Sequence, residues 1–243
     1  MDSTKLNKEE IAKYIDHTNV KADASRSDIK KLCQEAVKYG FHSVCVTPYR
    51  VKDAFLTLTS LQLRKLERVA EIICVVGFPF GFVKTEEKIL EANTAIKDGA
   101  TEIDMIINIG AIKDGDWKFV ESDIHQIARS ISPVKLKVIM EIGFLSKAEL
   151  IKACQIAKRA GAAFVKTSTG HGPRVPNPSD IKLMRKTVGK EMGVKASGGI
   201  HDFKTAVKMI KAGATRIGTS SGLQIIGVDK PRIKKFTHGH GHE

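Results

Sequence analysis

The stretch AKRAGAAFVKTS, residues 157–168, decides the fold because it joins the end of an amphipathic helix to a short apolar strand. The same phrase, a helical pattern that ends at glycine and an apolar run that follows, recurs at residues 36–46, 96–107 and 210–220. Glycine at a helix C-terminus adopts the left-handed conformation that ends the helix. The apolar run after it is typical of a strand covered on both faces. The chain is therefore predicted to repeat a strand–helix unit.

Eight strands can be counted along the chain, with helices between them. They are expected at Tyr14–His17, Ser43–Val46, Ile72–Val76, Glu102–Ile107, Lys137–Glu141, Phe164–Thr167, Val194–Ser197 and Arg216–Gly218. Such alternation indicates a parallel sheet, and eight units favour a closed barrel over an open sheet. The length of 243 residues suits one barrel of this kind, which typically needs about 250 residues. We predict a single-domain α/β fold, a (βα)8 TIM barrel over residues 1–236, followed by a flexible tail over residues 237–243.

Composition narrows the class of protein and its partners. No run approaches the roughly 20 apolar residues that span a membrane, and the charged N-terminus lacks the apolar core of a signal peptide. Four cysteines without C-x-x-C spacing are expected to be free thiols, as in a reducing compartment. We therefore expect a cytoplasmic protein with no membrane partner.

The net charge of +13 favours anionic ligands. It would also suit nucleic-acid binding, which predicts clustered basic residues and interleaved aromatic residues or a known motif. Lysines are instead spread along the chain, aromatic residues are only 6%, and no such motif is present. We expect no nucleic-acid partner.

Two lysines, Lys166 and Lys195, lie within apolar strands that are neighbours in the predicted barrel. A lysine in such a strand is unfavourable unless it has a partner or a function. Repulsion between the two would lower the pKa of Lys166 and give the neutral amine that a Schiff-base nucleophile requires. Asp104, a carboxylate in another apolar strand, is placed to act as a general acid–base. A purely structural interpretation would make one lysine a salt-bridged residue of the barrel.

Two further carboxylates lie at predicted strand ends, where barrel enzymes place their active-site groups. Asp16 either takes part in proton transfer or orients a lysine. For Glu141, a buried salt bridge to a barrel lysine and a catalytic role remain equally open.

The loops after the last two strands are rich in glycine and serine. They read SGGI at 197–200 and GTSSG at 218–222, and each precedes a predicted helix. Backbone N–H groups at helix N-termini bind phosphate, and (βα)8 barrels commonly bind phosphate at these two loops. We predict phosphate contacts from Gly198, Gly199, Ser220 and Ser221.

Six motifs together resemble the deoxyribose-phosphate aldolases, a family of class I aldolases. The motifs are IDHT at 15–18, VCVTP at 44–48, EIDMIINIGA at 102–111, FVKTSTG at 164–170, VKASGGI at 194–200 and GTSSG at 218–222. Their order and spacing match over nearly the whole chain, and KTSTG together with KASGGI is highly specific.

The resemblance implies reversible cleavage of 2-deoxy-D-ribose 5-phosphate to D-glyceraldehyde 3-phosphate and acetaldehyde, in deoxyribonucleotide catabolism. It implies that Lys166 forms the Schiff base, that Lys195 is the second lysine and that Asp104 transfers protons. Substrate-binding residues are then expected at Asp16, Thr18, Cys45, Thr169 and Gly170. The resemblance further implies no metal and no cofactor, sugar phosphate and aldehyde ligands, and a homo-oligomer, a dimer or higher. His171, which follows KTSTG, is expected at the loop rim.

Two more classes of barrel protein would share part of this pattern. A different phosphate-binding barrel enzyme, such as an epimerase, isomerase or transaldolase, would have the terminal glycine-rich loops but would not need two lysines in neighbouring strands. A barrel without activity would not need Lys166, Lys195 and Asp104 together.

Overall fold

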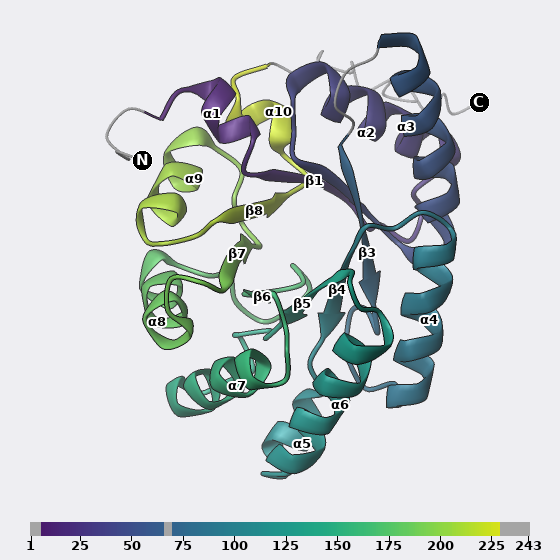
Figure 1. Cartoon of the computed structure of the whole chain (residues 1–243). Coiled ribbons are helices and arrows are strands. Elements are labelled where there is room, and N and C mark those ends of the chain that lie inside the picture. Colours follow the sequence, from purple (N-terminus) through teal and green to yellow (C-terminus); the bar gives the residue numbers. More distant parts are fainter. Residues whose placement is uncertain (1–5, 66–69, 229–243) are drawn as a thin grey trace, which may run out of the picture.

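The computed structural model describes residues 6–65 and 70–228, and its eight parallel strands close into a barrel in the order β1 to β8 (Figure 1). The strands are β1 Ile15–Asn19, β2 Ser43–Val46, β3 Glu71–Val76, β4 Glu102–Ile106, β5 Lys135–Ile139, β6 Phe164–Lys166, β7 Gly193–Ser197 and β8 Arg216–Thr219. The predicted (βα)8 barrel is confirmed. The predicted boundary at residue 236 and the tail over 237–243 lie outside the described residues.

Helices surround the barrel, and those between β1 and β8 connect consecutive strands (Figure 1). They are α1 Lys8–Ala12, α2 Arg26–Tyr39, α3 Val51–Lys65, α4 Thr85–Lys97, α5 Ile109–Lys113, α6 Trp117–Ser130, α7 Lys147–Arg159, α8 Pro178–Val188, α9 Phe203–Lys211 and α10 Gly222–Ile225, with a 3-10 turn at Pro48–Arg50. Because the helical connections return the chain from the end of one strand to the start of the next, all eight strands point their C-terminal ends to the same mouth of the barrel.

The ends of the helices follow from local sequence. Ser25 and Ser146 each form a capping box at the start of α2 and α7, and the Asp202 side chain accepts a hydrogen bond from the Thr205 N–H at the start of α9. Gly40 ends α2 in the left-handed conformation, with φ of 67°. The predicted glycine stop is confirmed at Gly40, and the serine and aspartate caps supply the helix starts.

The predicted and observed bounds of the strands differ most at β5. The strand was expected at Lys137–Glu141, and it lies at Lys135–Ile139 because Lys135 and Leu136 already pair with β4. This shift of two residues has consequences for the site. It puts Lys137 in the middle of the strand, facing the barrel interior, and it puts Glu141 beyond the end of the strand.

Apolar side chains fill two separate regions. The large core lies between the strands and the surrounding helices. A small cluster of Cys45, Ile73 and Val75 fills the barrel interior on the side of β2 and β3. The rest of the interior, on the side of β4 to β8 and β1, therefore has room for polar side chains.

One buried ion pair ties the outer layer together beside β4. Lys88 of α4 lies 2.7 Å from Asp123 of α6, and both side chains are almost completely buried. The Lys88 amine also donates to the Ile106 carbonyl at the end of β4, and Thr85 donates to Asp123. The pair thus joins two helices to the strand that carries Asp104.

Removing the carboxylate of Asp123 is expected to destabilise the barrel strongly. Asp123→Ala leaves the buried Lys88 amine without its anion, which typically lowers the free energy of unfolding by about 3–5 kcal/mol. Urea denaturation measures the effect. The double variant Lys88→Met/Asp123→Leu, which leaves no charge behind, should recover most of the loss; a single-variant loss below about 1 kcal/mol would contradict this account.

Candidate active site

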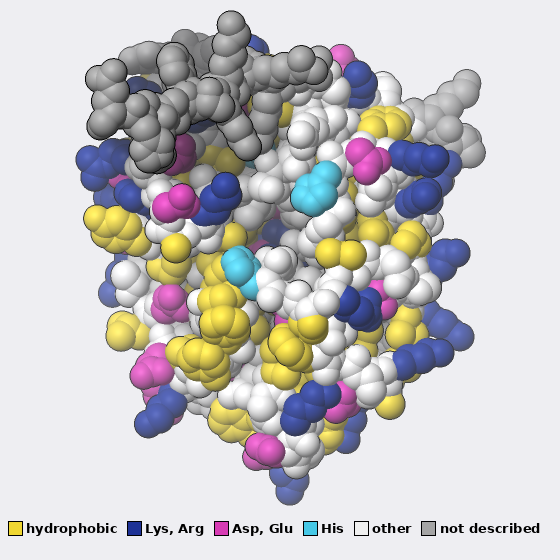
Figure 2. Space-filling model, turned by 180° about the vertical axis from the view of Figure 1, so that it is seen from behind, with side chains coloured by type: hydrophobic (Ala, Val, Ile, Leu, Met, Phe, Trp, Pro, Cys, Tyr) yellow, Lys and Arg dark blue, Asp and Glu magenta, His cyan; other side chains and the backbone are white. Residues whose placement is uncertain are grey.

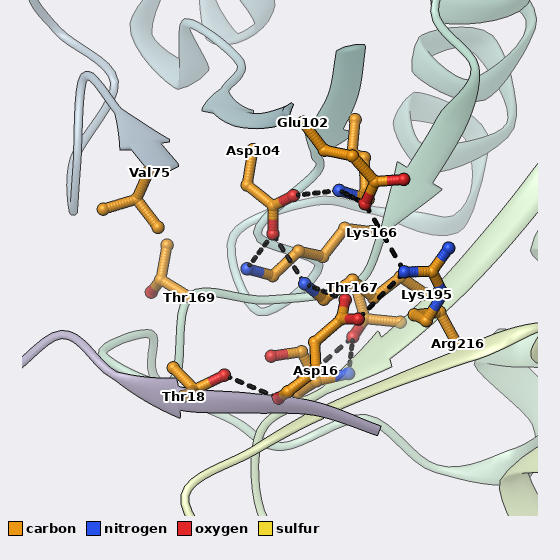
Figure 3. Close-up of polar contacts among 12 residues, drawn as sticks. Asp16, Thr18, Val75, Glu102, Asp104, Lys166, Thr167, Thr169, Lys195 and Arg216 are labelled. Carbon is orange, nitrogen blue, oxygen red and sulfur yellow. Dashed lines mark hydrogen bonds and ion pairs between the residues drawn. The ribbon is translucent and has the colours of Figure 1, made fainter. Parts of the chain in front are cut away.

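Asp104 lies in the barrel interior with three lysine amines around its carboxylate (Figure 3). Its Oδ1 accepts a hydrogen bond from Lys137 at 2.9 Å. Its Oδ2 accepts from both Lys166 at 2.9 Å and Lys195 at 2.8 Å. Lys166 and Lys195, the two lysines singled out in the sequence, therefore share one carboxylate oxygen, which lies between their amines.

The ion pairs continue around the interior and close into a ring. The Lys195 Nζ lies 2.6 Å from the Asp16 Oδ2. The Arg216 guanidinium lies 2.9 Å from the Asp16 Oδ1 and 3.4 Å from the Glu102 Oε2, and so joins these two carboxylates. Glu102 in turn lies 2.7 Å from Lys137. We call these residues, with Lys166, the charged cluster; its members are Asp16, Glu102, Asp104, Lys137, Lys166, Lys195 and Arg216.

Strand register brings these side chains together. Lys166 pairs with Lys195 in the β6–β7 ladder, and Asp104 pairs with Lys137 in the β4–β5 ladder. Because side chains alternate along a strand, Glu102 and Asp104 both point inward from β4. Six of the eight strands, all except β2 and β3, thus contribute to the charged cluster.

Burial and the neighbouring charges shift the pKa values of Asp16, Asp104 and Lys195 in opposite directions. Burial raises the pKa of Asp104, but Lys137, Lys166 and Lys195 outweigh it and hold the pKa of Asp104 well below its usual range. Burial likewise opposes ionisation of Asp16, whose pKa is nevertheless lowered by Lys195 and Arg216. Burial disfavours the charge on Lys195, but Asp104 and Asp16 together raise its pKa above the ordinary value. Asp16, Asp104 and Lys195 therefore stay charged at neutral pH.

The ring of Phe164, the first residue of β6, lies close to two cations of the charged cluster. The Lys137 amine and the Arg216 guanidinium lie 5.8 Å and 5.4 Å from the centre of the Phe164 ring, within the range of cation–π attraction. Gly193 of β7 leaves room for this ring, because a Cβ at that position would overlap it.

The other predicted substrate-binding residues lie around the mouth. Thr18 is half-buried and donates to the Asp16 carbonyl at 2.9 Å. Cys45 is fully buried in the small interior cluster, and burial raises the pKa of its thiol. Thr169 is buried on the loop after β6, and Gly170 beside it is exposed with φ of 94°.

Unpaired backbone N–H groups gather on the predicted phosphate loops. Among the described residues, none accepts a hydrogen bond from the N–H of Gly170, Gly198, Gly199 or Ser220. The positive φ of Gly198 and Gly199, 102° and 68°, turns the backbone in a way that favours glycine. The loop after β6 lies against this turn, since a Cβ on Gly199 would meet Val175 at 2.8 Å. Such free N–H groups are suited to an anion.

The two helices that follow these loops differ. The first turn of α9 is already capped by its own Asp202. Ser221 at the start of α10 makes no capping hydrogen bond with its side chain, although its N–H donates to Thr219 and its hydroxyl contacts His201 at 3.0 Å. The available donors therefore belong to the loops and to α10 rather than to the first turn of α9.

Glu141 departs from the sequence-based expectation. Of the two alternatives left open for Glu141, the salt bridge to a barrel lysine is not formed, because Glu141 makes no ion pair with any described residue. Its carboxylate instead accepts hydrogen bonds from the N–H and the hydroxyl of Thr169. His171 lies exposed at the rim, with its ring edge-on to Phe78.

Sequence reasoning missed Lys137, Glu102 and Arg216 as members of the site. Each was placed at the first residue of a predicted strand, where a charge is usually solvated. The available signal was spacing: Glu102 is two residues before Asp104, so both must share a face of the strand.

The model of the DeoC/LacD aldolase family matches residues 10–227. The chain belongs to this family of aldolases. A deoxyribose-phosphate aldolase from Aciduliprofundum boonei is 56% identical over 219 residues, which cover 89% of this chain and 96% of the relative. One from Thermococcus kodakarensis is 51% identical over 223 residues, covering 91% and 97%. The predicted family is confirmed.

Solved structures agree with this assignment. The deoxyribose phosphate aldolase from Aeropyrum pernix, described as a unique tetramer, superimposes with a TM-score of 0.80 at 31% identity. The match covers 90% of this chain and 91% of that one. This DeoC/LacD aldolase is therefore an enzyme of the carbon–carbon lyase class.

Other classes of site find little support among the described residues. No described helix is long and apolar enough to cross a membrane. Within residues 6–65 and 70–228, no group of three or more His, Cys, Asp or Glu side chains is placed to hold a metal ion. On the face seen in Figure 2, the described lysine and arginine side chains lie scattered and do not gather in one basic patch.

The lowered pKa values of Asp16 and Asp104 predict how stability depends on pH. Unfolded carboxyls titrate near about pH 4, so the stability these two groups contribute is present above that pH and is lost as the pH falls toward their lower folded pKa values. Asp104→Asn should therefore flatten the fall of unfolding free energy between about pH 4 and pH 2.5, by up to about 1.4 kcal/mol per pH unit.

Chemical denaturation across this pH interval measures the slope. The matched control is Asp114→Asn, at an exposed carboxylate that forms no ion pair with any described residue, and it should keep the wild-type slope. Equal slopes for Asp104→Asn and the wild type would contradict the account of the charged cluster.

Proposed function

We propose that this chain is a deoxyribose-phosphate aldolase that reversibly cleaves 2-deoxy-D-ribose 5-phosphate to D-glyceraldehyde 3-phosphate and acetaldehyde, through a Schiff base on Lys166. One observation carries the proposal: a buried lysine at the mouth of the barrel shares Asp104 with Lys195. The relatives named above, which cover nearly the whole chain, support the choice of substrate.

Charge balance supports Lys166 as the nucleophile. The charged cluster holds three carboxylates and four cations, so a neutral Lys166 leaves equal numbers of positive and negative groups. Lys166 pairs with Asp104 alone, whereas Lys195 lies between Asp104 and Asp16. Lys166 therefore has fewer anionic partners than Lys195, and a neutral amine is the form in which a lysine acts as a nucleophile.

The reaction then follows from the position of the Lys166 amine. Its Nζ attacks the aldehyde carbon of the open-chain sugar, and loss of water gives an iminium. When a base takes the proton of the C3 hydroxyl, C3 becomes the aldehyde carbon of the leaving fragment as the C2–C3 bond breaks. The electron pair of that bond forms the C1=C2 double bond, and the iminium π pair moves to the nitrogen. This releases glyceraldehyde 3-phosphate and leaves an enamine, which is protonated at C2 and hydrolysed to acetaldehyde.

Asp104 is suited to assist these steps in two ways. Its carboxylate lies 2.9 Å from the Lys166 Nζ and stabilises the positive charge of the iminium. Lys166 is also one of the cations that lower the pKa of Asp104. When Lys166 is neutral, its contribution to lowering the pKa of Asp104 is lost. Asp104 then becomes a better proton acceptor, as proton transfer requires.

The phosphate of the substrate is assigned to the free N–H groups of Gly170, Gly198, Gly199 and Ser220, with the Ser221 hydroxyl. Thr18, Cys45 and Thr169 are assigned to the walls between this anchor and Lys166. No cofactor or metal is assigned a role, since every step uses side chains or water.

The proposal extends to the cellular location, the pathway and the oligomeric state of the enzyme. We place it in the cytoplasm, in deoxyribonucleotide catabolism; its four cysteines are free thiols, as a reducing compartment favours. We assign it a homo-oligomeric state, supported by the tetramer described for the Aeropyrum pernix relative.

Trapping the Schiff base tests the proposal. The protein is incubated with 2-deoxyribose 5-phosphate or with acetaldehyde, reduced with borohydride and mapped by mass spectrometry. Reduction converts an iminium into a stable amine, so an adduct is expected on Lys166 and is expected to be absent in Lys166→Ala. An adduct on Lys195 would reverse the roles of the two lysines. No adduct with either compound, in folded protein, would overturn the Schiff-base mechanism.

A further inference from the structure

Glu141 differs from the other acidic residues inside the barrel because it has hydrogen-bond donors around it but no cation. Its side chain is buried, and Oε2 accepts from the Thr169 N–H at 2.9 Å and from the Thr169 hydroxyl. Its Oε1 has no hydrogen-bond partner among the described residues. A buried carboxylate is retained in such a setting only where its contacts serve the fold or the site.

The direction of the Glu141 side chain is set by an unusual backbone conformation. Glu141 is the one non-glycine residue of the described chain with a positive φ, 48°. The Met140 N–H donates to the Lys166 carbonyl, yet the Ile142 N–H donates to the Thr167 carbonyl, so the chain after β5 advances two residues while that after β6 advances one. Glu141 is the extra residue, as in a bulge, and bulges near active sites commonly redirect a side chain.

The loop after β6 is fitted closely around the Glu141 carboxylate. A Cβ on Gly172 would overlap the Glu141 Oε1. A Cβ on Gly143 would meet Pro173 of the same loop at 2.8 Å. The two glycines therefore let the chain after β5 and the chain after β6 lie against each other.

These contacts fix the residues on both sides of Gly170. Thr169 uses its N–H and its hydroxyl proton on Glu141, and its Oγ1 then accepts from the His171 N–H at 3.0 Å. The Gly170 N–H between them has no acceptor among the described residues. Thr169 is left as an acceptor only, so the Gly170 N–H is the free backbone donor between Thr169 and His171.

We infer that Glu141 is a positioning residue that sets the preference for phosphorylated substrates, by holding Thr169 so that the Gly170 N–H points at the substrate phosphate. The inference rests on the proposed function for the identity of the substrate. Glu141 itself is not assigned any contact with the reacting atoms.

The test compares two substrates that differ only in the phosphate, 2-deoxyribose 5-phosphate and 2-deoxyribose. Glu141→Ala should lower kcat/KM for the phosphorylated sugar by at least about 10-fold, mainly through KM, and should change kcat/KM for 2-deoxyribose by less than about 3-fold. Glu141→Gln, whose amide oxygen still accepts from Thr169, should retain most of the preference. Acetaldehyde and borohydride should still label Lys166 in both variants, because acetaldehyde has no phosphate.

A second variant acts without removing Glu141. Gly172→Ala pushes the carboxylate away from Thr169 and should give the same selective loss, whereas Gly110→Ala on α5, whose added methyl meets nothing closer than 3.4 Å, should not. Equal losses on both sugars, or no loss on either, would overturn the inference while labelling of Lys166 leaves the proposed function intact. Absence of labelling in the wild type would instead count against the proposed function.

Discussion

The carboxylate of Asp104, buried in contact with three lysine amines, is the interaction on which the rest of the barrel interior depends. Lys137, Lys166 and Lys195 come from three consecutive strands, and without a shared anion their amines would repel one another in a setting with little water. Asp16 and Glu102 extend the same arrangement through Arg216. The charged cluster thus holds one more cation than it holds carboxylates, and Lys166 is the lysine in it with a single anionic partner.

Two features outside the charged cluster convert this interior into a site. Glycine-rich loops after β7 and β8 leave backbone N–H groups without partners, at the same end of the barrel as Lys166. Lys166 ends β6 and Gly170 follows four residues later, so one short segment links the proposed nucleophile to the proposed phosphate site. The fixed backbone around Glu141 is what keeps that segment in place.

The sequence was sufficient for the fold because each strand–helix unit carries its own signals, a glycine stop and a capped start, which do not depend on distant contacts. It was also sufficient to single out Lys166, Lys195 and Asp104, which interrupt apolar runs. It was insufficient for Lys137 and Arg216, whose partners are set by the register between strands. It was misleading for Glu141, because a positive φ at a non-glycine residue cannot be foreseen from spacing.

A crystal structure of the protein after borohydride reduction with 2-deoxyribose 5-phosphate would test the central claim most directly. The account predicts a covalent bond from the Lys166 Nζ to C1 of the ligand, with Asp104 in contact with that nitrogen. It also predicts the phosphate on the N–H groups of Gly170, Gly198, Gly199 and Ser220. A ligand bound through Lys195, or a phosphate held away from these loops, would contradict it.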